Sequence, residues 1–183
     1  GGATPSAPPG GLAMAGDANA CRGEGVGVLD FAVGGPDLKT PENIQEAAFR
    51  AIRSGQTHYT PPAGIPEIRQ AIADHYTRKM GLPTQAAQVV VSNGAKHSLH
   101  NALMAVTGPG DEVNIPAPYW VSYADLVKLT GATPVIVSTT EASGFKLTPD
   151  AFRAAVTPRT KLLMINSPSN PTGAVSDRAE LEA

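Results

Sequence analysis

Apolar residues recur along most of the chain in short runs, and turn-forming residues separate these runs. Short continuous apolar runs predict buried strands, and longer stretches with apolar residues at helical spacing predict helices. The predicted strands are residues 28–33, 89–91, 112–115, 134–138 and 161–166, and the predicted helices between the later strands are residues 95–106, 118–130 and 149–155. This alternation is typical of βαβ units, so we expect an α/β fold with a mostly parallel sheet covered on both faces.

Further helices are predicted from residues that typically stand at helix ends. Thr40 is a suitable N-cap and Pro41 fits the first helical position, while Gly55 stands where this helix should end. The next helix is expected to stop at Gly81. Ser176 is the expected N-cap of a last helix.

The composition favours a soluble globular protein without a nucleic-acid or membrane partner. Apolar residues make up 42% of the chain and the net charge is −2. No apolar run is long enough to span a bilayer, and the N-terminus lacks the pattern of a secretory signal. The single cysteine, Cys21, cannot form an internal disulfide, and no Cys/His cluster has metal-ligand spacing. We therefore expect a cytoplasmic protein with no metal site.

Glycine and proline are unevenly distributed. The chain has 19 glycines and 17 prolines, and residues 1–27, where few apolar residues stand, hold 11 of these 36. Residues 1–26 are therefore predicted to form a flexible N-terminal arm. The chain stops at Ala183 inside a predicted helix, whereas domains usually end in exposed linkers. We expect the sequence to be the front part of a longer protein.

Three loops that follow predicted strands carry residues suited to a ligand. Ser92-Asn93-Gly94-Ala95-Lys96 opens a helix, where free N–H groups, the helix dipole and Lys96 suit a phosphate; an ordinary strand–helix turn has the same pattern. Trp120 would either stack on a planar ring or lie in the core. Asn170 would either donate its amide to an anionic oxygen or hold its own turn. If the strands are parallel, the loops meet at one edge of the sheet and form a crevice.

Residues 33–37, 59–66, 92–96, 116–123 and 167–173 form five motifs that follow one another along the chain. Taken in this order, they closely resemble class I pyridoxal-phosphate aminotransferases of the bacterial aspartate aminotransferase branch, and the resemblance covers about residues 28–183. It implies the three-layer α/β/α large domain of fold-type I transferases, incomplete in this chain. Residues 1–26 would be the arm, residues 27–45 a segment of the small domain, and residues 46–183 the front part of the cofactor-binding large domain.

The resemblance also implies roles for individual residues toward pyridoxal 5′-phosphate. In this family the backbone at Ala95 and Lys96 cradles the cofactor phosphate, and Tyr59 reaches the neighbouring subunit's phosphate across a homodimer interface. Trp120 stacks on the pyridine ring. Asn170 hydrogen-bonds the ring oxygen O3′, which would stabilise its negative charge and tune the pKa of the Schiff base.

Substrate contacts follow from the same resemblance. The backbone near Gly34 would lie against the α-carboxylate, and Trp120 and Asn170 also border the substrate. A threonine that helps members of this branch to recognise a distal carboxylate has no counterpart near residues 10–11, which leaves Lys96 as the candidate for holding an acidic side chain. His97 stands where the family often has glutamine.

Three catalytic groups of the family have no counterpart in this chain. Members form a Schiff base with a lysine, pair the pyridine nitrogen with an aspartate and bind the substrate carboxylate with an arginine, all beyond the position of residue 183. None of the six lysines stands in the matching context. We therefore assign no catalytic residue here, and we expect the chain by itself to be inactive.

The resemblance predicts the activity of the whole protein. It would move an amino group between an amino acid, with aspartate as first choice, and a 2-oxo acid such as 2-oxoglutarate. Two alternatives stay open: a prephenate or aromatic aminotransferase of the same family, and a naturally truncated protein that binds the cofactor or pairs with full-length subunits without catalysis. A lyase or racemase of the same fold is disfavoured by the contexts of Trp120 and Asn170.

Overall fold

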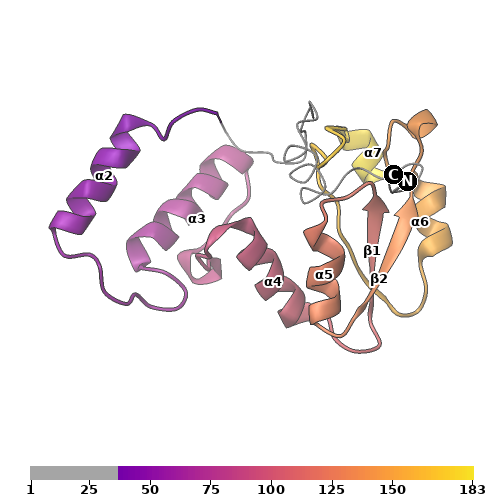
Figure 1. The fold of residues 1–183 in the computed structure, drawn as a ribbon, viewed down its shortest axis with the longest axis horizontal. Helices are drawn as coiled ribbons and strands as arrows, with labels where there is room; N and C mark the ends of the chain where they lie inside the picture. Colours follow the sequence, from indigo (N-terminus) through magenta and orange to yellow (C-terminus); the bar gives the residue numbers. More distant parts are fainter. Residues whose placement is uncertain (1–36) are drawn as a thin grey trace, which may run out of the picture. The chain divides into compact units, whose positions relative to one another are not determined.

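A computed structural model of the chain describes residues 37–183, and the chain divides into two units between Tyr59 and Thr60 (Figure 1). The predicted arm at 1–26, the strand at 28–33, Cys21 and Gly34 lie outside the described residues. No helix in residues 37–183 is long and apolar enough to cross a membrane.

The described part of the first unit contains one helix, α2 (Glu42–Arg53). Its N-cap is Pro41 rather than the predicted Thr40, because the Thr40 side chain makes no cap bond; its carbonyl instead accepts from the Gln45 amide. The predicted end is confirmed, since Gly55 has a φ of +78°, which favours glycine, and its N–H donates to the carbonyl of Ile52. No residue of α2 is buried.

The second unit begins with α3 (Pro66–Met80), which ends at Gly81 in the left-handed conformation, as predicted. A short 3-10 helix, η1 (Ala86–Gln88), follows. The predicted strand at 89–91 is wrong, because these residues pair with no other strand among the described residues. The Val91 N–H donates to the carbonyl of Ala63, and Arg69 of α3 donates to the carbonyl of Val89. This extended segment lies against the α3 region with Val89 buried, whereas Val90 is 62% exposed.

The rest of the second unit is a three-stranded parallel sheet with the order β2-β1-β3 and its connecting helices. Its elements are α4 (Gly94–Val106), β1 (Glu112–Ala117), α5 (Ser122–Leu129), β2 (Thr133–Ser138), η2 (Glu141–Ser143), α6 (Pro149–Ala155), β3 (Thr160–Leu163) and α7 (Arg178–Glu182). The α/β class with a parallel sheet is therefore confirmed.

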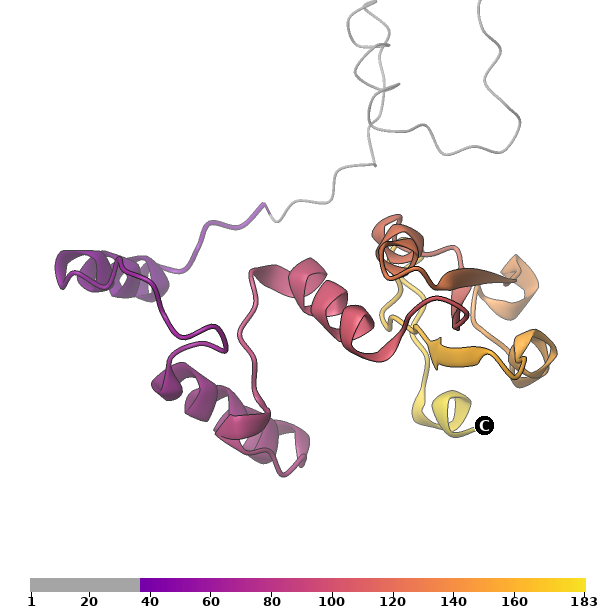
Figure 2. The ribbon, with the colours of Figure 1, turned by 90° about the horizontal axis from the view of Figure 1, so that it is seen from below.

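Successive side chains of β1 point to opposite faces of the sheet, and helices cover both faces. Val113 and Ile115, both fully buried, pack in one cluster with Leu103 of α4 and Val127 of α5. Asn114 points to the opposite face, where its amide donates to the last carbonyl of α6 at 3.3 Å. Figures 1 and 2 show α5 and α6 on the two sides of the strands. The three layers follow from this arrangement.

Some predicted boundaries differ from the structure. The helix predicted at 118–130 starts only at Ser122, after a loop that contains Pro118 and Trp120, and the strand predicted at 161–166 ends at Leu163. The last helix is capped by Asp177 and not by Ser176, because the Asp177 carboxylate accepts the N–H of Glu180 at 2.9 Å.

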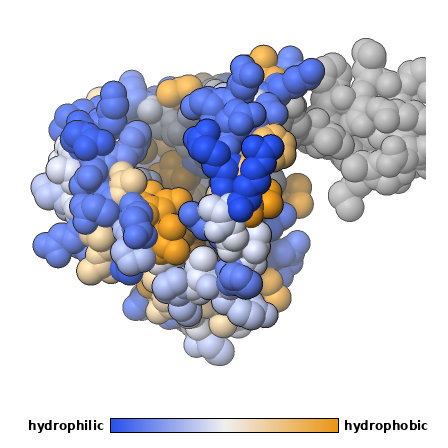
Figure 3. Space-filling model, turned by 90° about the vertical axis from the view of Figure 1, so that its left-hand side faces the viewer, coloured by the Kyte–Doolittle hydropathy of each residue, from blue (hydrophilic) through white to orange (hydrophobic). Residues whose placement is uncertain are grey.

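Large apolar side chains remain exposed in both units. Figure 3 shows apolar side chains at the surface among polar ones. On α2 the exposed members are Ile44, Phe49 and Ile52. Since α2 buries none of its residues, these side chains contribute no core packing within the described part of its unit.

Candidate functional site

The N-terminus of α4 presents backbone donors without acceptors. Gly94 has a φ of +80°, which turns the chain into the helix. The Gly94 N–H donates to the carbonyl of Ser92, and the Asn93 N–H donates to the ring of His97. No side chain caps this helix, and the N–H groups of Ala95 and Lys96 have no acceptor within residues 37–183. These two amides, predicted to cradle a phosphate, are therefore available to an anion.

Lys96 lies over the ring of Trp120, with 4.9 Å between its ammonium nitrogen and the ring centroid. The structure thus brings together two predicted site residues that are far apart in the sequence. A lysine in the first turn is unfavourable for the helix itself, because the helix dipole is positive there. The indole face offsets part of this cost, and a bound anion would offset more of it.

Tyr123 extends this group and was not among the site residues predicted from the sequence. Its ring meets that of Trp120 edge to face, with centroids 5.5 Å apart. Burial raises the pKa of the Tyr123 phenol, so the group stays protonated and able to donate at neutral pH. The sequence signal that could have found it is its position three residues after Trp120, in a segment with several aromatic residues that follows a predicted strand.

A cavity of about 260 Å³ lies beyond Tyr123 at the carboxyl ends of β1 and β3. Its lining combines aromatic and apolar side chains with a few polar ones, and includes Tyr119, Tyr123, Phe152, Asn166 and Asn170. Asn170 therefore borders the same cavity as Tyr123, whereas Trp120 and Lys96 are not among its lining residues. Ligands of open α/β sheets bind at this edge.

The loop that carries Asn170 is held by its own hydrogen bonds. The Asn170 N–H donates to the side-chain oxygen of Asn166 at 2.8 Å, and the Ser169 N–H donates to the carbonyl of Ala174 at 2.8 Å. The side chain of Asn170 is exposed and has no hydrogen-bond partner within the part of the chain that the structure describes. Its amide is free to donate to a ligand.

Two predicted site residues are not placed with this group. Tyr59 ends the first unit and its side chain is fully exposed, and Gly34 lies outside the described residues. Residues 37–183 also contain no cluster of histidine, cysteine and carboxylate side chains suited to a metal ion.

Comparison with known proteins identifies the family. The family model for aminotransferase class I and II matches residues 26–183. The chain belongs to this family. Among solved structures, this aminotransferase chain superposes on the aspartate aminotransferase from Rhizobium meliloti with a TM-score of 0.86 and 43% identity, over 91% of this chain and 42% of that one. The Thermus thermophilus aspartate aminotransferase with maleate gives a TM-score of 0.84 and 45% identity, over 91% of this chain and 44% of that one.

A curated relative, the aspartate/prephenate aminotransferase of Cereibacter sphaeroides, is 52% identical over 172 residues. The match covers 94% of this aminotransferase chain but only 43% of the relative. The family depends on pyridoxal phosphate, and the residues present fit one end of that group: two backbone amides without acceptors at the start of α4, next to a cationic and an aromatic side chain. The two amides and the cation suit a phosphate ester, and the aromatic side chain suits a planar ring.

Proposed function

We propose that the whole protein is a pyridoxal-phosphate aminotransferase that moves the amino group of aspartate to 2-oxoglutarate. The observation that carries the proposal is the open N-terminus of α4 beside the Lys96–Trp120 contact. The family membership and the names of the relatives support it. When bound, the cofactor supplies an electron sink for the bonds at the substrate's α-carbon.

Within this proposal, the chain's own residues bind and orient the cofactor. The N–H groups of Ala95 and Lys96 would hold its phosphate, and the indole of Trp120 would support its ring. The amide of Asn170 would donate to the ring oxygen, where negative charge gathers. Tyr59 is fully exposed in its unit, which supports a contact with the neighbouring subunit of a homodimer.

Lys96 is proposed to bind the distal carboxylate of an acidic substrate. Its ammonium lies at the helix start and contacts Trp120 without pairing to a carboxylate among residues 37–183. A charge-assisted hydrogen bond is worth about 1.5–3 kcal/mol. We therefore expect Lys96→Gln, in the complete natural chain, to raise the KM for aspartate by about tenfold or more and to leave that for a neutral amino acid nearly unchanged.

The test measures oxaloacetate formed from aspartate and 2-oxoglutarate by the complete chain loaded with pyridoxal phosphate. Lys128→Gln is the matched control, because Lys128 is an exposed lysine on α5 that pairs with Asp125 at 3.6 Å. Release of pyruvate and ammonia from amino acids without any oxo-acid acceptor would contradict amino-group transfer.

Prephenate is the second candidate acceptor. The relative from Cereibacter sphaeroides carries both aspartate and prephenate in its name. Prephenate and 2-oxoglutarate are therefore compared as acceptors with aspartate as the common donor, and oxaloacetate is measured in both cases. A kcat/KM for prephenate at least equal to that for 2-oxoglutarate would assign the protein to prephenate amination, and the contacts proposed for the cofactor would be the same.

A further inference from the structure

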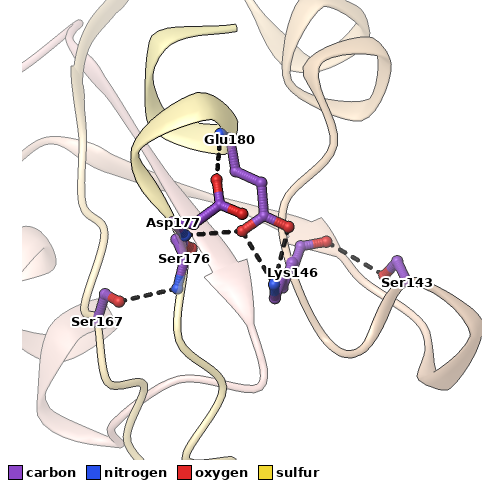
Figure 4. A network of polar contacts seen from close by, with 6 residues as sticks. All are labelled: Ser143, Lys146, Ser167, Ser176, Asp177 and Glu180. Atoms are coloured by element: carbon purple, nitrogen blue, oxygen red, sulfur yellow. Dashed lines mark hydrogen bonds and ion pairs between the residues drawn. The ribbon is translucent and has the colours of Figure 1, made fainter.

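A network of polar contacts joins three separate segments next to the candidate site (Figure 4). It contains Lys146 after η2, the start of α7, and Ser167 in the loop that carries Asn170. None of its members has been assigned a functional role above. Lys146, Glu180, Ser176 and Asn170 all line the same cavity of about 260 Å³.

The centre of the network is the ion pair between Lys146 and Glu180. The ammonium nitrogen lies 2.8 Å from one carboxylate oxygen and 2.9 Å from the other, and Figure 4 shows the two side chains pointing toward one another. The side chains are only 32% and 39% exposed. The hydroxyl of Ser143 donates to the carbonyl of Lys146 at 3.1 Å, which fixes the backbone on that side.

Glu180 also organises the start of α7. Its carboxylate accepts the N–H of Asp177 at 2.9 Å, and the Asp177 carboxylate accepts the N–H of Glu180 at 2.9 Å. This is a capping box, in which each side chain binds the other's backbone. The hydrogen bonds from Lys146 and from the Asp177 backbone lower the pKa of the Glu180 carboxyl, so the group is ionised at neutral pH.

The capping box connects directly to the loop of Asn170. The N–H of Ser176, the residue before Asp177, donates to the hydroxyl oxygen of Ser167 at 2.9 Å. Ser167 stands one residue after Asn166, whose side chain accepts the N–H of Asn170. The start of α7 is thus linked to the backbone of Asn170 by two hydrogen bonds through the neighbouring residues 166 and 167.

We propose that Lys146 and Glu180 are positioning residues whose ion pair holds the loop at 166–176, and with it the amide of Asn170, against the ring oxygen of the cofactor. The inference rests on the proposed function, because it needs a bound pyridoxal phosphate. A partly exposed ion pair would by itself add little to stability, whereas a displaced hydrogen-bond donor changes the electronic state of the bound ring.

The test uses the complete chain loaded with pyridoxal phosphate and its variants Lys146→Met and Glu180→Gln. The readout is the pH at which the absorbance of the cofactor's Schiff base changes between its protonated and unprotonated forms. A hydrogen-bond donor at the ring oxygen stabilises the negative charge there, which would otherwise hold the imine proton, so the donor lowers the pKa of the Schiff base. Loosening the donor should therefore raise this pH, by roughly half a unit in each variant.

Two further variants separate positioning from general damage. The exchange Lys146→Glu with Glu180→Lys restores an ion pair with its charges reversed but not the hydrogen bond from the Asp177 N–H, and is therefore expected to return the transition part of the way. Lys128→Met removes an exposed ion pair on α5 and is expected to leave the transition unchanged. Urea midpoints recorded in parallel report whether each variant is folded.

Each outcome is decisive. If the single variants lose stability but keep the parent's spectral transition, or if the exchange restores nothing, the ion pair does not position Asn170 and the inference is overturned. If the unmodified protein shows no Schiff-base absorbance at all, the proposed function fails as well. A raised transition in both single variants, partly reversed by the exchange, supports the inference.

Discussion

The backbone N–H of Asn93 donates to Nδ1 of His97 at 3.1 Å, so the imidazole takes the place of a capping side chain at the start of α4. In most capping boxes a glutamate or glutamine reaches back to this N–H. Here the ring of His97 is the acceptor for the Asn93 N–H, so this N–H is already satisfied. The amides of Ala95 and Lys96 therefore form the donor pair that remains for an anion.

This relationship predicts that His97 controls the affinity for the cofactor phosphate. His97→Ala removes the acceptor and frees the loop before α4, which should weaken pyridoxal phosphate binding about fivefold, the equivalent of one hydrogen bond of about 1 kcal/mol. His97→Gln keeps an acceptor that can reach the same N–H and should bind as the parent does. Titration of the complete chain, followed by Trp fluorescence, measures both. Equal affinity of the alanine variant would show that the bond does not organise the loop.

Gly64 is predicted to be intolerant of any side chain. Its φ is +98°, and an added Cβ would lie 2.5 Å from Cγ2 of Val91 and 2.9 Å from its Cβ. Gly64→Ala should therefore lower the free energy of unfolding by about 3 kcal/mol, from backbone strain and overpacking together. Gly81→Ala is the control, because Gly81 has a φ of +65° with no atom near the added Cβ. It should cost about 1 kcal/mol. Urea unfolding compares the two, and equal losses would contradict the packing argument.

The sequence predicts the order of helices and strands from 94 to 182 well, because their periodicity and boundary residues act locally. The strand predicted at residues 89–91 is wrong for a physical reason. A run of valines is equally suited to a buried strand and to an extended segment packed on α3, and only a neighbouring strand makes the first possible. The hydrogen bonds to Ala63 and from Arg69 decide the matter, and no local pattern reveals them.

The separate loops of the candidate site could be predicted from the sequence, but the contacts between their side chains could not. Each of Ala95, Lys96, Trp120 and Asn170 stands after an apolar segment, which local reading can recognise. The contact of Lys96 with Trp120, the edge-to-face contact of Trp120 with Tyr123, and the shared cavity of Tyr123 and Asn170 depend on how α4 and α5 pack on the sheet. Such contacts between distant residues follow only from the three-dimensional arrangement.

Asn114 is predicted to tolerate an apolar residue better than a charged one. It is fully buried on β1, its amide makes a 3.3 Å bond to Ala155, and its side-chain oxygen has no donor within residues 37–183. Asn114→Leu removes the unsatisfied oxygen and should change the free energy of unfolding by only about 1 kcal/mol. Asn114→Asp buries a carboxylate without a donor and should cost about 3 kcal/mol or more at pH 7. Urea unfolding of both variants measures this order, and the reverse order would be inconsistent with an orphaned acceptor.

Glu112 is predicted to make the stability of the second unit depend on pH. Its side chain is 8% exposed, and its carboxylate accepts from the hydroxyl of Thr157 at 2.6 Å and from the guanidinium of Arg159 at 2.8 Å. The hydrogen bond from Thr157, together with that from Arg159, holds the pKa of Glu112 below its usual value.

The sign of the dependence follows from this lowered pKa. The contribution of Glu112 is fully present above the ordinary glutamate value of about 4.3 and is lost as the pH falls through the lower folded-state value. Glu112→Gln should therefore lower the urea midpoint at pH 7, and the difference from the parent should shrink below about pH 4.

Glu182→Gln is the matched control, because Glu182 pairs with Arg178 on the exposed end of α7 and such surface pairs contribute little. It should leave the midpoint nearly unchanged at both pH values. Since both changes remove one negative charge, a difference between the two variants at pH 7 isolates the contacts of Glu112 from the general effect of net charge. A loss in Glu112→Gln that is equally large at pH 7 and at pH 3 would mean that its ionised contacts with Thr157 and Arg159 do not stabilise the fold.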